Sequence, residues 1–262
     1  MNIVSSLVAG WGLAAGLMLV LWAVQRRRGN AGIVDVAWAF ATGLLGVGFA
    51  WVGSGDVARR VAIAVMAGLW GLRLGAYLFK RVGRQPEDGR YQHLRGEWGA
   101  QAQRNLFVFF QVQALWAVMF AAPMLAGAAN PRPFGWLDAL GVLIWLAALG
   151  GESIADQQLA RFKARAADKA RVCRDGLWRY SRHPNYFFEW LHWWAYVCLA
   201  AGSPLWWIAA AGVVVMWLFL TRVTGIPPTE AQALRSRGEA YREYQRTTSA
   251  FVPWPPTEEG SQ

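Results

Sequence analysis

The sequence predicts an all-α, polytopic membrane protein with about seven transmembrane helices. Hydrophobic residues make up 55% of the 262 residues, and 17 residues are tryptophan. The apolar residues come in long runs, and a helix needs about 20 such residues to cross the hydrocarbon core. Backbone groups within lipid must be hydrogen-bonded inside the protein, so helices are the favoured architecture. We therefore expect residues 1–262 to form a single membrane domain with large cytoplasmic connections.

The first four apolar runs are expected to span the membrane. The first run is too long for the apolar core of a signal peptide and has no basic leader, so we expect it to be retained. Two pairs of glycines at spacing i, i+4 predict close helix contacts, namely Gly12 with Gly16 and Gly71 with Gly75. The four runs cover residues 3–25, 32–53, 58–79 and 105–129.

The last three apolar runs are less regular. The fifth run is apolar through Gly150 and then carries Glu152 and Asp156, which indicates a helix that continues beyond the lipid. The sixth and seventh runs are separated only by the Gly-Ser-Pro sequence at 202–204, which predicts a tight hairpin. Because the sixth run is short for a full span, a tilted or partial pair is an alternative. The three runs cover residues 135–158, 187–202 and 204–224.

Basic residues predict the orientation of these helices. Of the 26 Lys and Arg residues, 22 lie in four polar segments, at 26–28, 80–104, 161–182 and 222–246. Such residues concentrate in cytoplasmic loops, so the N-terminus is expected outside and the C-terminus in the cytoplasm. The net charge of +10 is then mainly a topology signal, with anionic lipid or a nucleotide as secondary partners and no nucleic acid.

Ionisable residues within the spans are costly and therefore point to pairs or functional sites. We expect Asp35 and Arg73 to form an ion pair, either structural or facing a substrate cavity. Tyr77 lies four residues after Arg73 and so on the same helical face. A cation near a tyrosine acidifies its phenol, which suits a proton donor. The alternative for Tyr77 is a place in the interfacial aromatic belt.

The segment Gln85–Tyr91 is a second candidate for the reaction site. Pro86 and Gly89 predict a turn that presents Glu87 and its charged neighbours. This turn either closes over a bound ligand or is simply solvated. No metal is expected, because the histidines lack ligand spacing and the two cysteines are isolated.

The C-terminal part is expected to form a soluble helix after Pro227 and Pro228. Thr229 is the predicted N-cap, with Gln232 three residues later, and the helix is expected to end near Arg246. One face of this helix either folds back over residues 176–189 or lies on the lipid headgroups. The residues of that face, at spacings of three or four, are Glu230, Leu234, Arg237, Tyr241 and Tyr244.

The most informative segment is Gly176–Glu189, which directly precedes a Trp-rich apolar helix. Arg179, Arg182 and His183 either mark a cytoplasmic helix start or bind an anionic group such as a nucleotide phosphate. The sequence has no GxGxxG fingerprint and no P-loop, so any nucleotide is expected in a site of another kind.

Three segments of the chain carry a family resemblance, namely Glu152–Lys163, Gly176–Glu189 and Tyr241–Pro253. In this order they resemble the membrane steroid 5-alpha-reductase-like family, specifically its bacterial DUF1295 branch, and more distantly the sterol C14 and C7 reductases. The resemblance implies that NADPH binds in the half of the chain at 131–253, with Asn185 at the nicotinamide end. The residues that it implies for cofactor binding are Asp156, Lys163, Trp178, Arg179, Arg182, His183, Asn185, Tyr186, Glu189, Glu230, Tyr241 and Tyr244.

The resemblance further implies a reductase that transfers hydride to a carbon–carbon double bond of a lipid-like substrate, such as a steroid or enone. Residues 1–130 would form the substrate cavity, 254–262 a flexible tail, and the host would be the bacterial cytoplasmic membrane. Tyr77, Asp35 and Glu87 are the expected catalytic residues. The second span departs from the steroid reductases, because Ile33–Trp38 lacks their adjacent Gln and Glu.

Two alternative functions remain at this stage. The sequence Arg182–Tyr186 with Glu230 also resembles the isoprenylcysteine carboxyl methyltransferases, which bind S-adenosylmethionine. The element containing Asp156 and Lys163 favours the reductase over this methyltransferase. A non-enzymatic membrane scaffold is the third possibility. Such a protein does not need so many converging polar residues, so the sequence favours it less than an enzyme.

Overall fold

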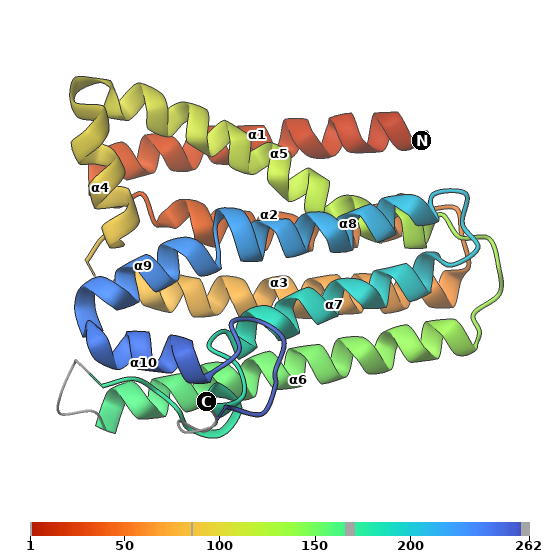
Figure 1. Cartoon of the computed structure of the whole chain (residues 1–262). Coiled ribbons are helices and arrows are strands. Elements are labelled where there is room, and N and C mark those ends of the chain that lie inside the picture. Colours follow the sequence, from red (N-terminus) through yellow and green to blue (C-terminus); the bar gives the residue numbers. More distant parts are fainter. Residues whose placement is uncertain (1, 85, 166–170, 258–262) are drawn as a thin grey trace. The chain divides into compact units, whose positions relative to one another are not determined.

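The computed structural model describes residues 2–84, 86–165 and 171–257. Gln85 of the predicted turn and residues 258–262 of the predicted tail lie outside this range. Within the described residues, every regular element is a helix or a helical turn (Figure 1). The elements are α1 (Ile3–Arg28), α2 (Ile33–Val52), α3 (Val57–Arg84), α4 (Gly89–Trp98), η1 (Gly99–Gln101), α5 (Ala102–Ala128), α6 (Trp136–Arg165), η2 (Gly176–Arg179), α7 (Pro184–Ala200), α8 (Trp206–Leu218), the π-helical η3 (Phe219–Val223), α9 (Ile226–Arg237) and α10 (Glu239–Thr247).

Six helical stretches of the described chain are long and apolar enough to cross a membrane. They include α1, α2, α3, α5, α6 and the run that begins with α8, so the chain has the helices of a multi-pass membrane protein. The predicted sixth span corresponds to α7, which has only 17 residues. The predicted hairpin after it is confirmed: Gly202 adopts φ 93° and the Ser203 amide donates to the Ala200 carbonyl.

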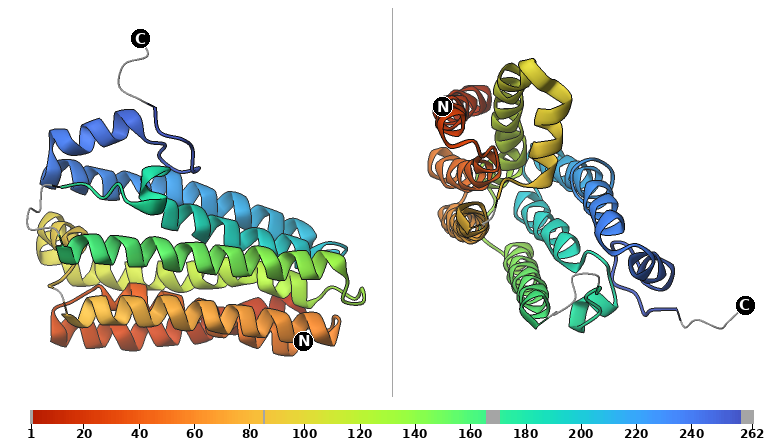
Figure 2. Two further views of the ribbon diagram at one scale, coloured as in Figure 1. Left: turned by 90° about the horizontal axis from the view of Figure 1, so that it is seen from below. Right: turned by 90° about the vertical axis from the view of Figure 1, so that its left-hand side faces the viewer.

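The chain divides into two compact units, and each is described here by itself. Unit 1 comprises Met1–Asp138 and Tyr196–Gly212, and unit 2 comprises Ala139–Ala195 and Val213–Gln262. In unit 1, α1, α2, α3 and α5 lie side by side, and α4 crosses their ends (Figures 1 and 2).

Close packing of α2 on α3 depends on glycine. A Cβ on Gly71 would lie 2.8 Å from the Cα of Gly43, and one on Gly75 would lie 2.6 Å from the Phe40 ring. The contact predicted for Gly71 and Gly75 is therefore confirmed. The pair Gly12 and Gly16 forms no such contact, since a Cβ at either position meets nothing within 4 Å.

A buried arginine holds the opposite end of unit 1 from α4. The Arg59 guanidinium binds both carboxylate oxygens of Asp138, at 2.5 and 2.8 Å. Its Nη1 also donates to the backbone carbonyls of Asn130 and Arg132, each at 2.8 Å. The Asn130 amide in turn donates to the carbonyls of Leu199 and Ala201. This network joins the start of α3, the loop after α5 and the end of α7.

The sequence prediction for the C-terminal helix is partly wrong. The helix begins at Ile226, because Gly225 occupies the N-cap and the prolines fill the first turn, where they lose no hydrogen bond. It then breaks at Gly238, which has φ 55°, so α9 and α10 replace the single predicted helix. Helix α6 does continue to Arg165, as expected from Glu152 and Asp156, which follow its apolar part.

Replacing Asp138 with Ala is expected to destabilise unit 1 by roughly 3–5 kcal/mol, because the buried Arg59 would lose its counter-charge. The measurement is the unfolding midpoint of the purified protein in detergent. The double variant Arg59→Met/Asp138→Leu serves as the control and should recover most of this loss. A single variant as stable as the wild type would contradict the role given to this pair.

Candidate functional site

Two of the predicted catalytic residues, Asp35 and Glu87, lie in a collar of charged side chains that holds α4 against the bundle. Asp35, at the start of α2, accepts a hydrogen bond from Tyr91 Oη at 2.7 Å and pairs with Arg90 at 3.3 Å. Asp35 therefore pairs with α4, and the ion pair predicted between Asp35 and Arg73 is wrong. Asp88 caps α4 and also pairs with Arg81 of α3.

Glu87 has a structural role in the same collar. Its Oε1 accepts from the Ala31 amide at 2.7 Å, and its carboxylate pairs with Arg95 at 3.1 Å. The turn is thus anchored to the loop between α1 and α2. Tyr77 lies on α3 with 45% of its surface exposed. Tyr91, which the sequence placed in the predicted turn together with Glu87, belongs to the same collar through its hydrogen bond to Asp35.

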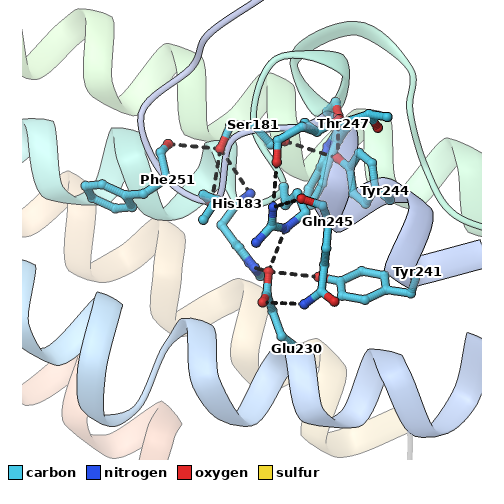
Figure 3. A network of polar contacts seen from close by, with 12 residues as sticks. Ser181, His183, Glu230, Tyr241, Tyr244, Gln245, Thr247 and Phe251 are labelled. Carbon is cyan, nitrogen blue, oxygen red and sulfur yellow. Dashed lines mark hydrogen bonds and ion pairs between the residues drawn. The ribbon is translucent and has the colours of Figure 1, made fainter. Parts of the chain in front are cut away.

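Unit 2 contains a second polar cluster, centred on the Glu230 carboxylate of α9. Figure 3 shows side chains from α9, α10 and the segment before α7 converging on this group. Glu230 Oε1 accepts from Arg182 Nε at 2.7 Å and Oε2 accepts from Gln245 Nε2 at 2.8 Å. Tyr241 Oη donates to Oε1 at 3.3 Å. The predicted fold-back of this face over residues 176–189 is confirmed. Arg237 instead donates to the Arg171 carbonyl.

Arg182 uses its remaining hydrogen bonds within the chain. Its Nη1 donates to the carbonyls of Gln245, at 3.1 Å, and Thr248, at the end of α10. The side chain is only 9% exposed. A buried guanidinium bound in this way connects backbone segments and carries a charge that Glu230 compensates. Its contacts therefore position the C-terminal part of unit 2.

Tyr244 connects α10 to the turn η2. Its hydroxyl donates to the carbonyl of Trp178 and lies 3.2 Å from that of Ser181. Trp178 in turn donates from its indole nitrogen to the Ala155 carbonyl of α6 at 2.9 Å. Burial raises the pKa of the Tyr244 and Tyr241 hydroxyls, so both remain protonated donors.

His183 lies beside the Glu230 carboxylate. Its Nε2 is 3.2 Å from Glu230 Oε1, and its ring stacks on Tyr186 with 5.3 Å between centroids. Burial lowers the pKa of His183, and the nearby Glu230 only partly offsets this effect. The imidazole is therefore neutral at neutral pH.

Asn185 differs from these residues because one of its polar atoms is not used. Its Nδ2 donates to Asp156 Oδ1 of α6 at 3.4 Å. Its Oδ1 is buried and has no hydrogen-bond partner among the described residues. A buried acceptor without a donor is costly, and such groups in folded proteins require an explanation. A ligand that presents an N–H group would satisfy this atom.

The remaining predicted cofactor residues lie around Asn185 or at the surface of unit 2. Tyr186 Oη lies 3.2 Å from the Thr229 hydroxyl. Glu189 is buried on α7, with one oxygen 3.9 Å from His192 Nδ1. Arg179 and Lys163 are exposed cations. No group of metal-binding side chains occurs in residues 2–84, 86–165 and 171–257.

Sequence reasoning missed two uncharged polar residues that complete the cluster, Ser181 and Gln158. Ser181 is fully buried and donates its hydroxyl to the Phe251 carbonyl at 2.9 Å. Gln158 accepts from the Leu177 amide at 2.9 Å and fills the space beside Gly176, which has φ 57°. Gly176 was the available signal, since glycine is the residue that adopts positive φ at little steric cost.

These features define a multi-pass helical membrane protein with a polar cluster built from its C-terminal helices. Residues 21–248 match the family model described as a protein of unknown function, DUF1295, and the chain belongs to this family. An uncharacterized protein of Schizosaccharomyces pombe is 29% identical over 272 residues, which cover 89% of this chain and 76% of that protein. No solved structure matches the chain. The family resemblance seen in the three sequence segments is thus confirmed.

Replacing Glu230 with Ala is expected to loosen the C-terminal helices, because Arg182 would be left as an uncompensated buried charge. The expected cost is roughly 3–5 kcal/mol. Hydrogen exchange at residues 239–250 measures it. Glu239→Ala is the matched control, since Glu239 also pairs with two arginines but is 66% exposed. Equal protection in the two variants would contradict the central role of Glu230.

The lowered pKa of His183 predicts a loss of stability in acid. The unfolded chain binds a proton below about pH 6.5 more readily than the folded one, so this contribution is present above that pH and lost as pH falls. Between pH 7 and 5, the unfolding midpoint should fall more in the wild type than in His183→Gln. His93→Gln, at a histidine with 73% exposure, should behave as the wild type. Identical pH profiles for all three proteins would refute the prediction.

Proposed function

We propose that this protein is an NADPH-dependent membrane reductase that acts on a carbon–carbon double bond of a lipid-like substrate. The DUF1295 family is linked in general to steroid-reductase-like enzymes, and this chain matches the family over residues 21–248. The single observation that carries the proposal is the buried, unsatisfied Oδ1 of Asn185, held in place by the contact with Asp156.

The residues present fit a nicotinamide cofactor. A carboxamide offers an N–H donor and a carbonyl acceptor, and the side chain of Asn185 has the complementary pair. In this proposal Asn185 orients the carboxamide and Tyr186 lies beside it. Arg179 and Lys163 are exposed cations that would bind phosphates.

The cofactor supplies hydride, and the protein supplies binding, orientation and exclusion of water. The cluster around Glu230 contributes rigidity, because it fixes the segment that precedes Asn185. Tyr77, Asp35 and Glu87 remain the proposed proton donors. Of these, Asp35 accepts a hydrogen bond from the Tyr91 hydroxyl at 2.7 Å.

The orientation and host membrane belong to the same proposal. The distribution of Lys and Arg places α9 and α10 on the cytoplasmic side, where NADPH would enter. The proposed location is the bacterial cytoplasmic membrane implied by the resemblance, although the curated relative is fungal.

A methyltransferase that binds S-adenosylmethionine is the second candidate. The observation that favours it is the contact of Arg182 and His183 with Glu230, which brings together three of the residues of that resemblance. These side chains bind one another, however, whereas Asn185 of the same segment keeps an unsatisfied buried acceptor. The reductase is therefore preferred.

Asn185→Ala is expected to weaken NADPH binding by roughly 1–3 kcal/mol, because the carboxamide would lose its partner. Titration of the detergent-purified protein with NADPH, followed by cofactor fluorescence, measures this change. Gln157→Ala, an exposed amide on α6, is the matched control and should bind as the wild type.

Saturable binding of S-adenosylmethionine without binding of NADPH would replace the reductase with the methyltransferase. Binding of neither compound would favour a scaffold. Unchanged NADPH affinity in Asn185→Ala would remove Asn185 from the cofactor site.

A further inference from the structure

The segment after α10, residues 248–257, forms a strap that is hydrogen-bonded to the turn before α7. The Arg182 amide donates to the Ser249 carbonyl at 2.8 Å, and the Trp254 amide donates to the Tyr180 carbonyl at 2.9 Å. Ser181 adds its bond to Phe251. These bonds are spread along the strap, so its backbone is held along most of its length and the direction of its side chains is defined.

The strap has an inner and an outer side. Phe251 is buried and packs on the rings of Phe187 and Trp190, with centroids 6.0 and 5.7 Å apart. Both of these residues lie in the first two turns of α7. Val252 and Trp254, in contrast, are 52% and 68% exposed. The strap thus lies beside the end of an apolar helix and presents a tryptophan outward.

This position matches the interface between membrane and water. Tryptophan and tyrosine are enriched at the headgroup level, where an apolar ring meets a polar surface. Tyr180 lies beside Trp254 through their backbone bond and is 42% exposed. Anionic headgroups attract exposed arginines, such as Arg246 of α10.

A hollow of about 300 Å³ lies against the strap. Its lining combines the cation of Arg246, Trp254 and the Ser249 hydroxyl. The hydroxyls of Thr247 and Thr257 instead donate to backbone carbonyls, and Thr248 is only 6% exposed. Arg246 is 59% exposed and shares its guanidinium with Glu239 through Nη1 alone. A phosphate accepts charge-assisted bonds from arginine and hydroxyl donors. The lining residues are Arg246, Thr247, Thr248, Ser249, Trp254, Pro255 and Thr257.

We propose that the strap is a membrane-surface anchor whose hollow binds the phosphate of one anionic phospholipid headgroup. Arg246 and the Ser249 hydroxyl bind the phosphate, and Trp254 inserts beside the glycerol at the headgroup level. The proposal is independent of the reductase function, because none of these residues belongs to the proposed cofactor site.

The experiment titrates the detergent-purified full chain with short-chain phosphatidylglycerol and counts bound lipids by native mass spectrometry. Arg246→Gln should weaken binding of the tightest lipid by roughly tenfold, the effect expected for one charge-assisted contact. Trp254→Ala should weaken it as well, because the ring would no longer pack beside the glycerol. Arg246→Lys should retain most of the binding, because the charge is kept.

Two matched controls make the test specific. Arg242→Gln removes a cation from the same helix that also pairs with Glu239 but does not line the hollow. Trp51→Ala removes a tryptophan that is 82% exposed in unit 1. Both should bind the lipid as the wild type. Equal loss in Arg242→Gln would overturn the proposal in favour of unspecific charge attraction.

Two further measurements identify the ligand. Phosphatidylcholine should bind more weakly than phosphatidylglycerol, since its net charge is zero. Inorganic phosphate should fail to displace the lipid, and displacement at similar concentrations would show a site for free phosphate and overturn the proposal. Unchanged lipid binding in Trp254→Ala would also overturn it.

Discussion

The contact between Arg182 and Glu230 is the interaction on which unit 2 depends. One carboxylate on α9 is bound by the turn before α7 and by two residues of α10, and the same arginine binds the backbone at the end of α10. Burying a charged pair has a desolvation cost, and this cost is offset only when both groups are fully hydrogen-bonded. The cluster meets this condition because each partner also binds other polar groups. Its consequence is that the chain before α7 has a single, defined course.

This constraint separates the polar residues of unit 2 into two groups. Arg182, His183, Tyr241 and Tyr244 satisfy one another or the backbone, so their contacts support the arrangement. Asn185 follows directly in sequence and keeps a buried acceptor that the described chain does not satisfy. A rigid support beside an unsatisfied group is the arrangement expected of a binding site, since ligand groups are held most accurately by side chains that cannot move.

Unit 1 uses charged side chains at both of its ends, buried at one end and partly exposed at the other. Arg59 and Asp138 join the loops at one end, whereas Asp35 and Glu87 attach α4 at the other. Between these ends the helices pack through small residues such as Gly43 and Gly71. Such contacts are typical of membrane helices, because the hydrophobic effect does not drive helices together within lipid. Charge therefore fixes the ends of the helices and close backbone contact fixes their middle.

Sequence alone determined the class of this protein, because long apolar runs have only one stable conformation in a bilayer. It also identified the glycines of the contact between α2 and α3, the hairpin at 202–204 and the three segments that place the chain in its family. These features are local, so neighbouring residues suffice to predict them.

Only the tertiary structure decided which polar groups meet. Charge and spacing suggested that Asp35 pairs with Arg73 and that one helix follows Pro228, and they left the partner of Arg182 open. In the structure Asp35 binds α4, Gly238 divides the helix, and Arg182 binds Glu230, which is 48 residues away. A charged side chain can pair with any of several groups of opposite charge. Which of them it meets depends on distances between helices, and no local sequence pattern contains these distances.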